Sequence, residues 1–221
     1  MMDEHHSDHQ TDHKPAHNSM PEIPKVDMKN VNVGNLKGGF GDIIEILKLN
    51  KAVMAKVAGR DSEGISLALV YFAVGTIVAS LGPAVFGIPL PIVGLIRIGF
   101  VSSLIGGVVA AVLGVIGLFL TNWVAESMFK GSGKFPQFFR VLGYASLLRV
   151  VEFFTIIPFL SLIVGVWLLV ILYNTLTEIH KLSSTNAVLT LLVAAVLAIV
   201  IGYILTMLGL GAPGISSFSL S

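Results

Sequence analysis

The chain has 221 residues, of which 54% are hydrophobic and only 12% are charged. An average soluble domain carries about 25% charged residues, so this composition and the mean hydropathy of +0.86 exclude an ordinary soluble globule. The 14 basic and 13 acidic side chains nearly cancel, so no basic field indicates nucleic acid as a partner. With no cysteine, disulfides and thiolate metal sites are excluded as well.

Residues 1–38 are polar and lack a helical apolar stripe, so we expect a disordered cytoplasmic tail. Imidazole and carboxylate groups alternate in it, and such groups bind zinc, nickel or copper, although weakly in a flexible tract. The histidines are His5, His6, His9, His13 and His17. A solvated tail without a metal role is the alternative, and no other cofactor is expected.

Residues 39–62 change to an amphipathic pattern, with apolar residues at helical spacing and lysines on the other face. Asp42 followed by Glu45 predicts a helix N-terminus, and Asn50 can cap a second short helix. Such a basic stretch before a membrane span either lies in the lipid interface, against anionic headgroups, or packs on the end of the helix bundle. Both arrangements are open at this point.

Residues 63–210 contain continuous apolar runs that favour membrane-spanning helices. We predict an all-α, polytopic membrane helix bundle of about five transmembrane helices, with a short external tail at 211–221. The predicted spans are 65–86, 100–124, 141–157, 159–177 and 187–208. The alternative lays 135–148 along the interface and takes 150–177 as one Pro-kinked helix, which gives four spans.

Basic residues near the span ends indicate how a membrane protein is oriented. With five spans, eight of them share one side and Arg97 lies on the other. This bias places the N-terminus in the cytoplasm and the C-terminus outside, in a prokaryotic cytoplasmic membrane or, in a eukaryote, the ER or Golgi membrane. The eight residues are Lys48, Lys51, Lys56, Arg60, Lys130, Lys134, Arg140 and Lys181.

Three stretches together resemble the Yip family, the Ypt/Rab-interacting membrane proteins, in its prokaryotic branch. They are 45–54 (EILKLNKAVM), 135–146 (FPQFFRVLGYAS) and 178–187 (EIHKLSSTNA). The resemblance implies five helices, a cytoplasmic N-terminus, an outward C-terminus and no catalytic activity, and it favours five spans over four. The positions that carry the motifs are Asn50, Arg140, Tyr144, Ser146, Glu178 and His180.

Eukaryotic members of that family act as membrane adaptors or shapers around small prenylated GTPases. This chain departs from the family pattern, because Leu147, Leu148 and Arg149 stand where a Pro often follows the Tyr-Ala-Ser, and the long cytoplasmic domain of eukaryotic relatives is absent. A GTPase partner is therefore not carried over. We expect a membrane-organising or partner-adaptor role, with membrane lipid and cytoplasmic proteins as partners, and homo-oligomerisation is left open.

Arg149 and Glu152 lie three residues apart in the predicted third span, so they share a helix face. Charged residues inside a span usually face a partner or a wet cavity. The two form either a polar site for a substrate, ion or lipid headgroup, or a self-neutralising pair that fixes helix packing. The first interpretation makes a small transporter or channel component the alternative function, and metal handling by the histidine tail is a weaker one.

Two further features have both a functional and a structural interpretation. Glu178, His180 and Lys181 end the fourth span, where His180 could titrate near neutral pH beside a carboxylate or belong to a solvated helix end. The second span carries small residues suited to packing within the chain or across a dimer. They are Gly106, Gly107, Gly114 and Gly117. Phosphate-loop and dinucleotide patterns at 130–135 and 209–214 lack required residues or context, so no enzyme is expected.

Overall fold

The structure is a computed structural model that describes residues 33–90, 94–96, 98–155, 157 and 159–207. The histidines of the predicted tail and the predicted external tail lie outside these residues. The elements in chain order are α1 (Val33–Leu47), α2 (Lys51–Ala58), α3 (Ser62–Val85), β1 (Ile88–Leu90), β2 (Gly94–Ile96), α4 (Phe100–Phe129), α5 (Phe135–Ala145), the 3-10 helix η2 (Ser146–Phe153), α6 (Leu160–Ile179) and α7 (Ser184–Met207).

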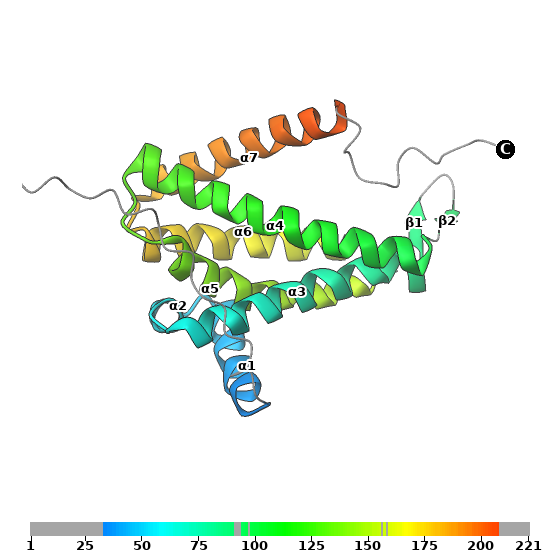
Figure 1. The fold of residues 1–221 in the computed structure, drawn as a ribbon, viewed down its shortest axis with the longest axis horizontal. Coiled ribbons are helices and arrows are strands. Elements are labelled where there is room, and N and C mark those ends of the chain that lie inside the picture. The colour runs from blue at the N-terminus through cyan, green and yellow to red at the C-terminus, as the bar shows by residue number, and fades with distance from the viewer. Residues whose placement is uncertain (1–32, 91–93, 97, 156, 158, 208–221) are drawn as a thin grey trace, which may run out of the picture.

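Among the described residues, four helices are long and apolar enough to cross a membrane, and they lie side by side in Figure 1. They are Glu63–Val85 within α3, Phe100–Phe129, Leu160–Ile179 and Ser184–Ile204 within α7. The predicted helical membrane bundle is confirmed. The antiparallel hairpin of β1 and β2, in which Ile88 pairs with Ile96, was not expected, because three-residue strands are too short to give a pattern.

A fifth pass along the bundle is made by α5 and η2 together, which run parallel to α3. Three positions on α3 mark the course: Gly64 lies beside Arg140, Gly75 against the carbonyl of Ser146, and Gly82 against the carbonyl of Phe153. At about 1.5 Å per α-helical and about 2.0 Å per 3-10 residue, the segment extends about 32 Å, close to the thickness of a hydrocarbon core. The chain therefore passes along the bundle five times.

The third predicted span is nevertheless wrong in detail. It was expected as one helix over 141–157, whereas the α-helix begins at Phe135 and gives way to 3-10 geometry from Ser146 to Phe153. The Ser146 hydroxyl donates to the carbonyl of Gly143 at this junction, a local bond that competes with regular helix. The alternative of one helix over 150–177 is also wrong, because Phe159, with φ of 63°, separates η2 from α6.

The tightest core lies where α1 and α2 meet α3, α5 and α6. Ile43 and Ile46 of α1 and Met54 and Val57 of α2 are buried there. The amphipathic stretch therefore packs on the end of the bundle, and α1 runs across the long axis of the bundle beside α3 (Figure 1). By contrast, α4 and α7 turn long apolar faces outward, as lipid-facing helices do.

The start of the amphipathic stretch also differs from the prediction. Asp42 was expected to cap a helix, but α1 begins at Val33 and Asp42 lies inside it. Asn50 does cap α2, because its side-chain oxygen accepts from the backbone N–H of Val53 at 3.3 Å. On α4, Gly107 packs on Ser80 of α3, and a second glycine packs in the same way on Phe72. Glycines 106 and 117 face open space.

Candidate functional site at the basic end of the bundle

One end of the bundle gathers α1, α2 and the loops that join α4 to α5 and α6 to α7, and we call it the basic end (Figure 1). The eight basic residues predicted to share a side all lie here. Lys51 of α2 pairs with Glu178 at the end of α6 at 2.6 Å. The backbone N–H of Ser132 donates to the carbonyl of His180 at 3.1 Å, which joins the two loops. Basic residues from separate segments of the chain thus gather at one end of the bundle.

The centre of the basic end is a hydrogen-bonded network around Arg60, just before α3. Its guanidinium pairs with the carboxylate of Asp42 on α1 and donates to the hydroxyl of Tyr144 on α5 at 2.7 Å. The same guanidinium lies 5.5 Å from the centre of the Tyr144 ring, and Tyr71 of α3 packs edge-on against that ring. Asp42 is only 8% exposed, so its charge needs this partner. The network joins α1, α3 and α5.

Sequence reasoning singled out Tyr144 but missed the roles of Asp42 and Arg60. A signal was present, because Asp42 lies three residues after Gly39 and four before Ile46, on the stripe of α1 that is buried. A carboxylate on an apolar stripe calls for a buried partner. Lys56 of α2 adds a second contact to Asp42 at 3.2 Å.

Asn50 and Glu45 organise the turn between α1 and α2. While its oxygen caps α2, the Asn50 amide donates to the Glu45 carboxylate at 3.0 Å. Lys48 adds an ion pair to Glu45 at 2.9 Å, and the hydrogen bonds from Lys48 and Asn50 lower the pKa of the Glu45 carboxyl. Leu49 adopts a left-handed conformation, with φ of 61°, between the two helices. The motif stretch 45–54 thus forms a hydrogen-bonded turn between α1 and α2.

Arg140 links α5 to the end of α2. Its guanidinium donates to the carbonyl of Ala58 at 2.7 Å, where the free carbonyls of a helix C-terminus favour a cation. Its Nε atom is buried and has no partner among the described residues. On α5, Arg140 therefore contacts α2 directly. One turn further on, Tyr144 is linked to α1 through Arg60.

His180 is placed differently from the expectation. The side chain is 1% exposed, lies edge-on against Phe138 at 5.3 Å, and has no hydrogen-bond partner for either ring nitrogen among the described residues. Burial lowers its pKa to about 4. Glu178 pairs with Lys51 instead, and Lys181 is exposed. Both interpretations of His180 are therefore wrong: it has no carboxylate partner to hold its pKa near neutral, and it is not part of a solvated helix end.

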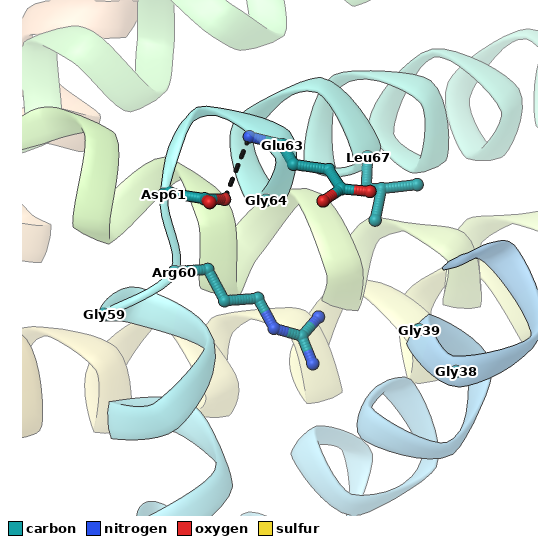
Figure 2. A pocket seen from close by; sticks show the side chains of 8 residues that line it. All are labelled: Gly38, Gly39, Gly59, Arg60, Asp61, Glu63, Gly64 and Leu67. Atoms are coloured by element: carbon teal, nitrogen blue, oxygen red, sulfur yellow. Dashed lines mark hydrogen bonds between the residues drawn. The ribbon is translucent and has the colours of Figure 1, made fainter. Parts of the chain in front are cut away.

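A cavity of about 570 Å³ opens between α1 and the junction of α2 with α3. Figure 2 shows the Arg60 guanidinium pointing toward α1, below the carboxylates of Asp61 and Glu63. Asp61 caps α3 by accepting from the backbone N–H of Glu63 at 3.1 Å. The lining residues are Gly38, Gly39, Gly59, Arg60, Asp61, Glu63, Gly64 and Leu67. Gly38 and Gly59 are exposed in a wall of mixed charge, which suits polar contacts rather than one ion.

Residues 45–207 match the family model of the Yip1 domain. This range covers about three quarters of the chain and contains all three motif stretches. The chain belongs to the Yip1 family. No curated protein and no solved structure shows a significant match to it.

Inside the Yip1 domain, the structure brings Arg149 and Glu152 together as predicted. Arg149 Nε lies 3.5 Å from the Glu152 carboxylate, and its Nη1 lies 3.5 Å from the hydroxyl of Thr76 on α3. Residues three apart on a 3-10 helix eclipse one another, so Ser146, Arg149 and Glu152 form one row on η2. That row borders a cavity of about 340 Å³ between α3, α4, η2 and α6.

The described part of the Yip1 domain shows no candidate metal site. Among the described residues, no group of three or more His, Asp or Glu side chains could hold an ion. The histidines proposed as weak ligands precede residue 33, outside the described residues. A metal role of that tail stays a prediction.

Proposed function

We propose that the chain is a non-enzymatic integral membrane protein whose basic end lies in the cytoplasm and organises membrane partners there. The observation that carries this proposal is the two-sided character of α1. Ile43 and Ile46 are buried against the bundle, whereas Phe40 and Ile44 on the other side expose 54% and 41% of their surface. Exposed apolar side chains on a held helix are typical of a surface that contacts lipid or protein.

The direction of α1 supports the same proposal. It runs across the long axis of the bundle (Figure 1), so in a membrane-spanning bundle it lies parallel to the membrane plane. Its exposed apolar edge then meets the boundary between headgroups and acyl chains, and nearby lysines face anionic headgroups. The ion pair of Asp42 with Arg60 holds the helix in that direction.

The cytoplasmic placement rests on charge. Eight basic residues lie at the end that carries α1 and α2, and the positive-inside rule puts such an end in the cytoplasm. Because the chain passes along the bundle five times, the C-terminal end of α7 then lies on the outer side. N-terminal cytoplasmic and C-terminal external placement are parts of this proposal.

Photo-crosslinking in native membranes tests the docking role. A photoreactive phenylalanine analogue replaces Phe40 in one variant and Val112 in another, because Val112 is equally exposed but lies on the lipid face of α4. We expect position 40 to give a discrete protein adduct in addition to lipid adducts, and position 112 to give lipid adducts only. The same adducts, or none, from both positions would contradict a docking role for α1.

A small transporter or channel component is the second candidate function. The observation that favours it is the pair of Arg149 and Glu152 bordering a cavity inside the bundle. Reconstituted vesicles separate the two candidates, because a transporter shows ion or solute flux that Arg149→Leu abolishes. The docking role predicts no flux above that of empty vesicles in either protein.

A further inference from the structure

The cavity bordered by η2 lies at the depth of a membrane interior. Thr76, which contacts Arg149, lies about 20 Å from Glu63 and about 14 Å from Val85 along α3 at 1.5 Å per residue. The polar row of Ser146, Arg149 and Glu152 forms one wall. The opposite walls are apolar, with Phe72 of α3 and a row of leucines on α6. The cavity is therefore an apolar space with one polar side.

The charged pair on the polar side has unused hydrogen-bonding capacity. A guanidinium carries five N–H donors, yet among the described residues Arg149 makes only its two contacts with Glu152 and Thr76, both at 3.5 Å. Hydrogen bonds of N–H to oxygen are usually about 2.9 Å long. In hydrocarbon no water completes such groups, and an unsatisfied polar group is costly. The Arg149 guanidinium and the Glu152 carboxylate can therefore both bind a third polar group.

The cavity reaches the outer surface of the bundle beside α6. Gly165 and Leu169 of α6 line it and are both exposed. A Cβ atom added at Gly165 would meet nothing within 4 Å, so the opening beside it is unobstructed. This surface is apolar and faces lipid, so a ligand would enter from the bilayer.

We propose that this cavity binds a neutral lipid with a hydroxyl headgroup, its chain lying along the apolar walls. The hydroxyl donates to the Glu152 carboxylate and accepts from the Arg149 guanidinium, which uses both charges of a pair that is neutral overall. An anionic headgroup would face the Glu152 carboxylate, and a cationic one would face Arg149. A zwitterionic phospholipid headgroup would have to leave the interface, whereas a neutral hydroxyl reaches this depth at a much smaller cost.

Photoaffinity labelling of the full chain in nanodiscs tests this inference. The probe is a 16-carbon alcohol with a diazirine in its chain, and matched probes end in a carboxylate or a methyl group. We expect the alcohol to label the region of Gly165 on α6, with competition by unlabelled hexadecanol. The methyl-ended probe should bind at least about tenfold more weakly, because it loses both hydrogen bonds of the hydroxyl to the charged pair.

Three variants keep the test independent of folding and of the docking role of α1. Gly165→Leu fills the opening and should abolish competed labelling, whereas Gly106→Leu, on an equally open part of α4, should leave it unchanged. Arg149→Leu with Glu152→Leu should remove the preference for the alcohol over the methyl-ended probe. Equal labelling of wild type and Gly165→Leu, or stronger labelling by the carboxylate probe, would overturn the inference.

Discussion

Asp42 on α1 and Arg60 at the start of α3 form an ion pair in the core of the basic end, with the Tyr144 hydroxyl as a third member. Asp42→Ala leaves the guanidinium without its charged partner, so we expect a loss of about 2 kcal/mol in stability, within the usual range for a hydrogen bond to a charged group. Thermal unfolding in detergent measures the loss. Lys48→Ala, which removes an exposed ion pair, is the control and should change stability by less than about 0.5 kcal/mol. Equal effects of the two changes would show that the network does not hold α1.

The close approach of α3 to the fifth pass depends on glycine. At Gly75 and Gly82 an added Cβ would collide with the carbonyl oxygens of Ser146 and Phe153. We expect Gly75→Ala to destabilise the bundle by about 1–3 kcal/mol, because backbone must move to admit the methyl group. Gly106→Ala, where nothing lies within 4 Å, is the matched control and should be neutral or slightly stabilising. If both variants unfold at the same temperature, the packing of η2 on α3 is not as described.

His180 makes stability depend on pH. Burial lowers its folded-state pKa to about 4 from the ordinary 6.5, so between these values the unfolded chain binds a proton that the folded chain does not. Stability should therefore fall as the pH drops from 6.5 toward 4, by about 2 kcal/mol at pH 5. His180→Leu should remove this part of the pH dependence when unfolding is measured from pH 7.5 to 4.5. An unchanged slope in that variant would assign the effect to other groups.

The histidine tail gives a prediction that does not depend on the bundle. If the tail binds metal, a chain that starts at Met20 should lose most of its nickel or zinc affinity in titration calorimetry, because His5, His6, His9, His13 and His17 are all removed. Its melting temperature without metal should equal that of the full chain. Equal metal binding by both chains would reject the tail as a site.

Much of the bundle could be predicted because a long apolar run in lipid can satisfy its backbone hydrogen bonds in few structures other than a helix. The limits of α4, α6 and α7 lie within a few residues of the predicted ones, except that α4 continues to Phe129. The 3-10 geometry of η2 could not be predicted, since apolar residues at a spacing of three or four suit either kind of helix, and the close contact of Ser146 with Gly75 is tertiary.

The candidate site was predictable to a smaller extent. The pairing of Arg149 with Glu152 follows from their spacing, and the place of Asn50 at the start of α2 follows from its capping chemistry. The role of Asp42 depends on Arg60, 18 residues away, and the burial of His180 depends on Phe138 from another helix. Local sequence carries no information on such distant partners.

The central claim is that the chain crosses the membrane five times, with the basic end inside. Because the native chain has no cysteine, a single cysteine at Ser217 or at Ser183, in the loop between α6 and α7, can be labelled without background. In intact cells, a membrane-impermeant maleimide should react at position 217 and reach position 183 only after the membrane is opened. Reaction at position 183 with protection at position 217 would mean four crossings or an inverted bundle, and either result would contradict the account.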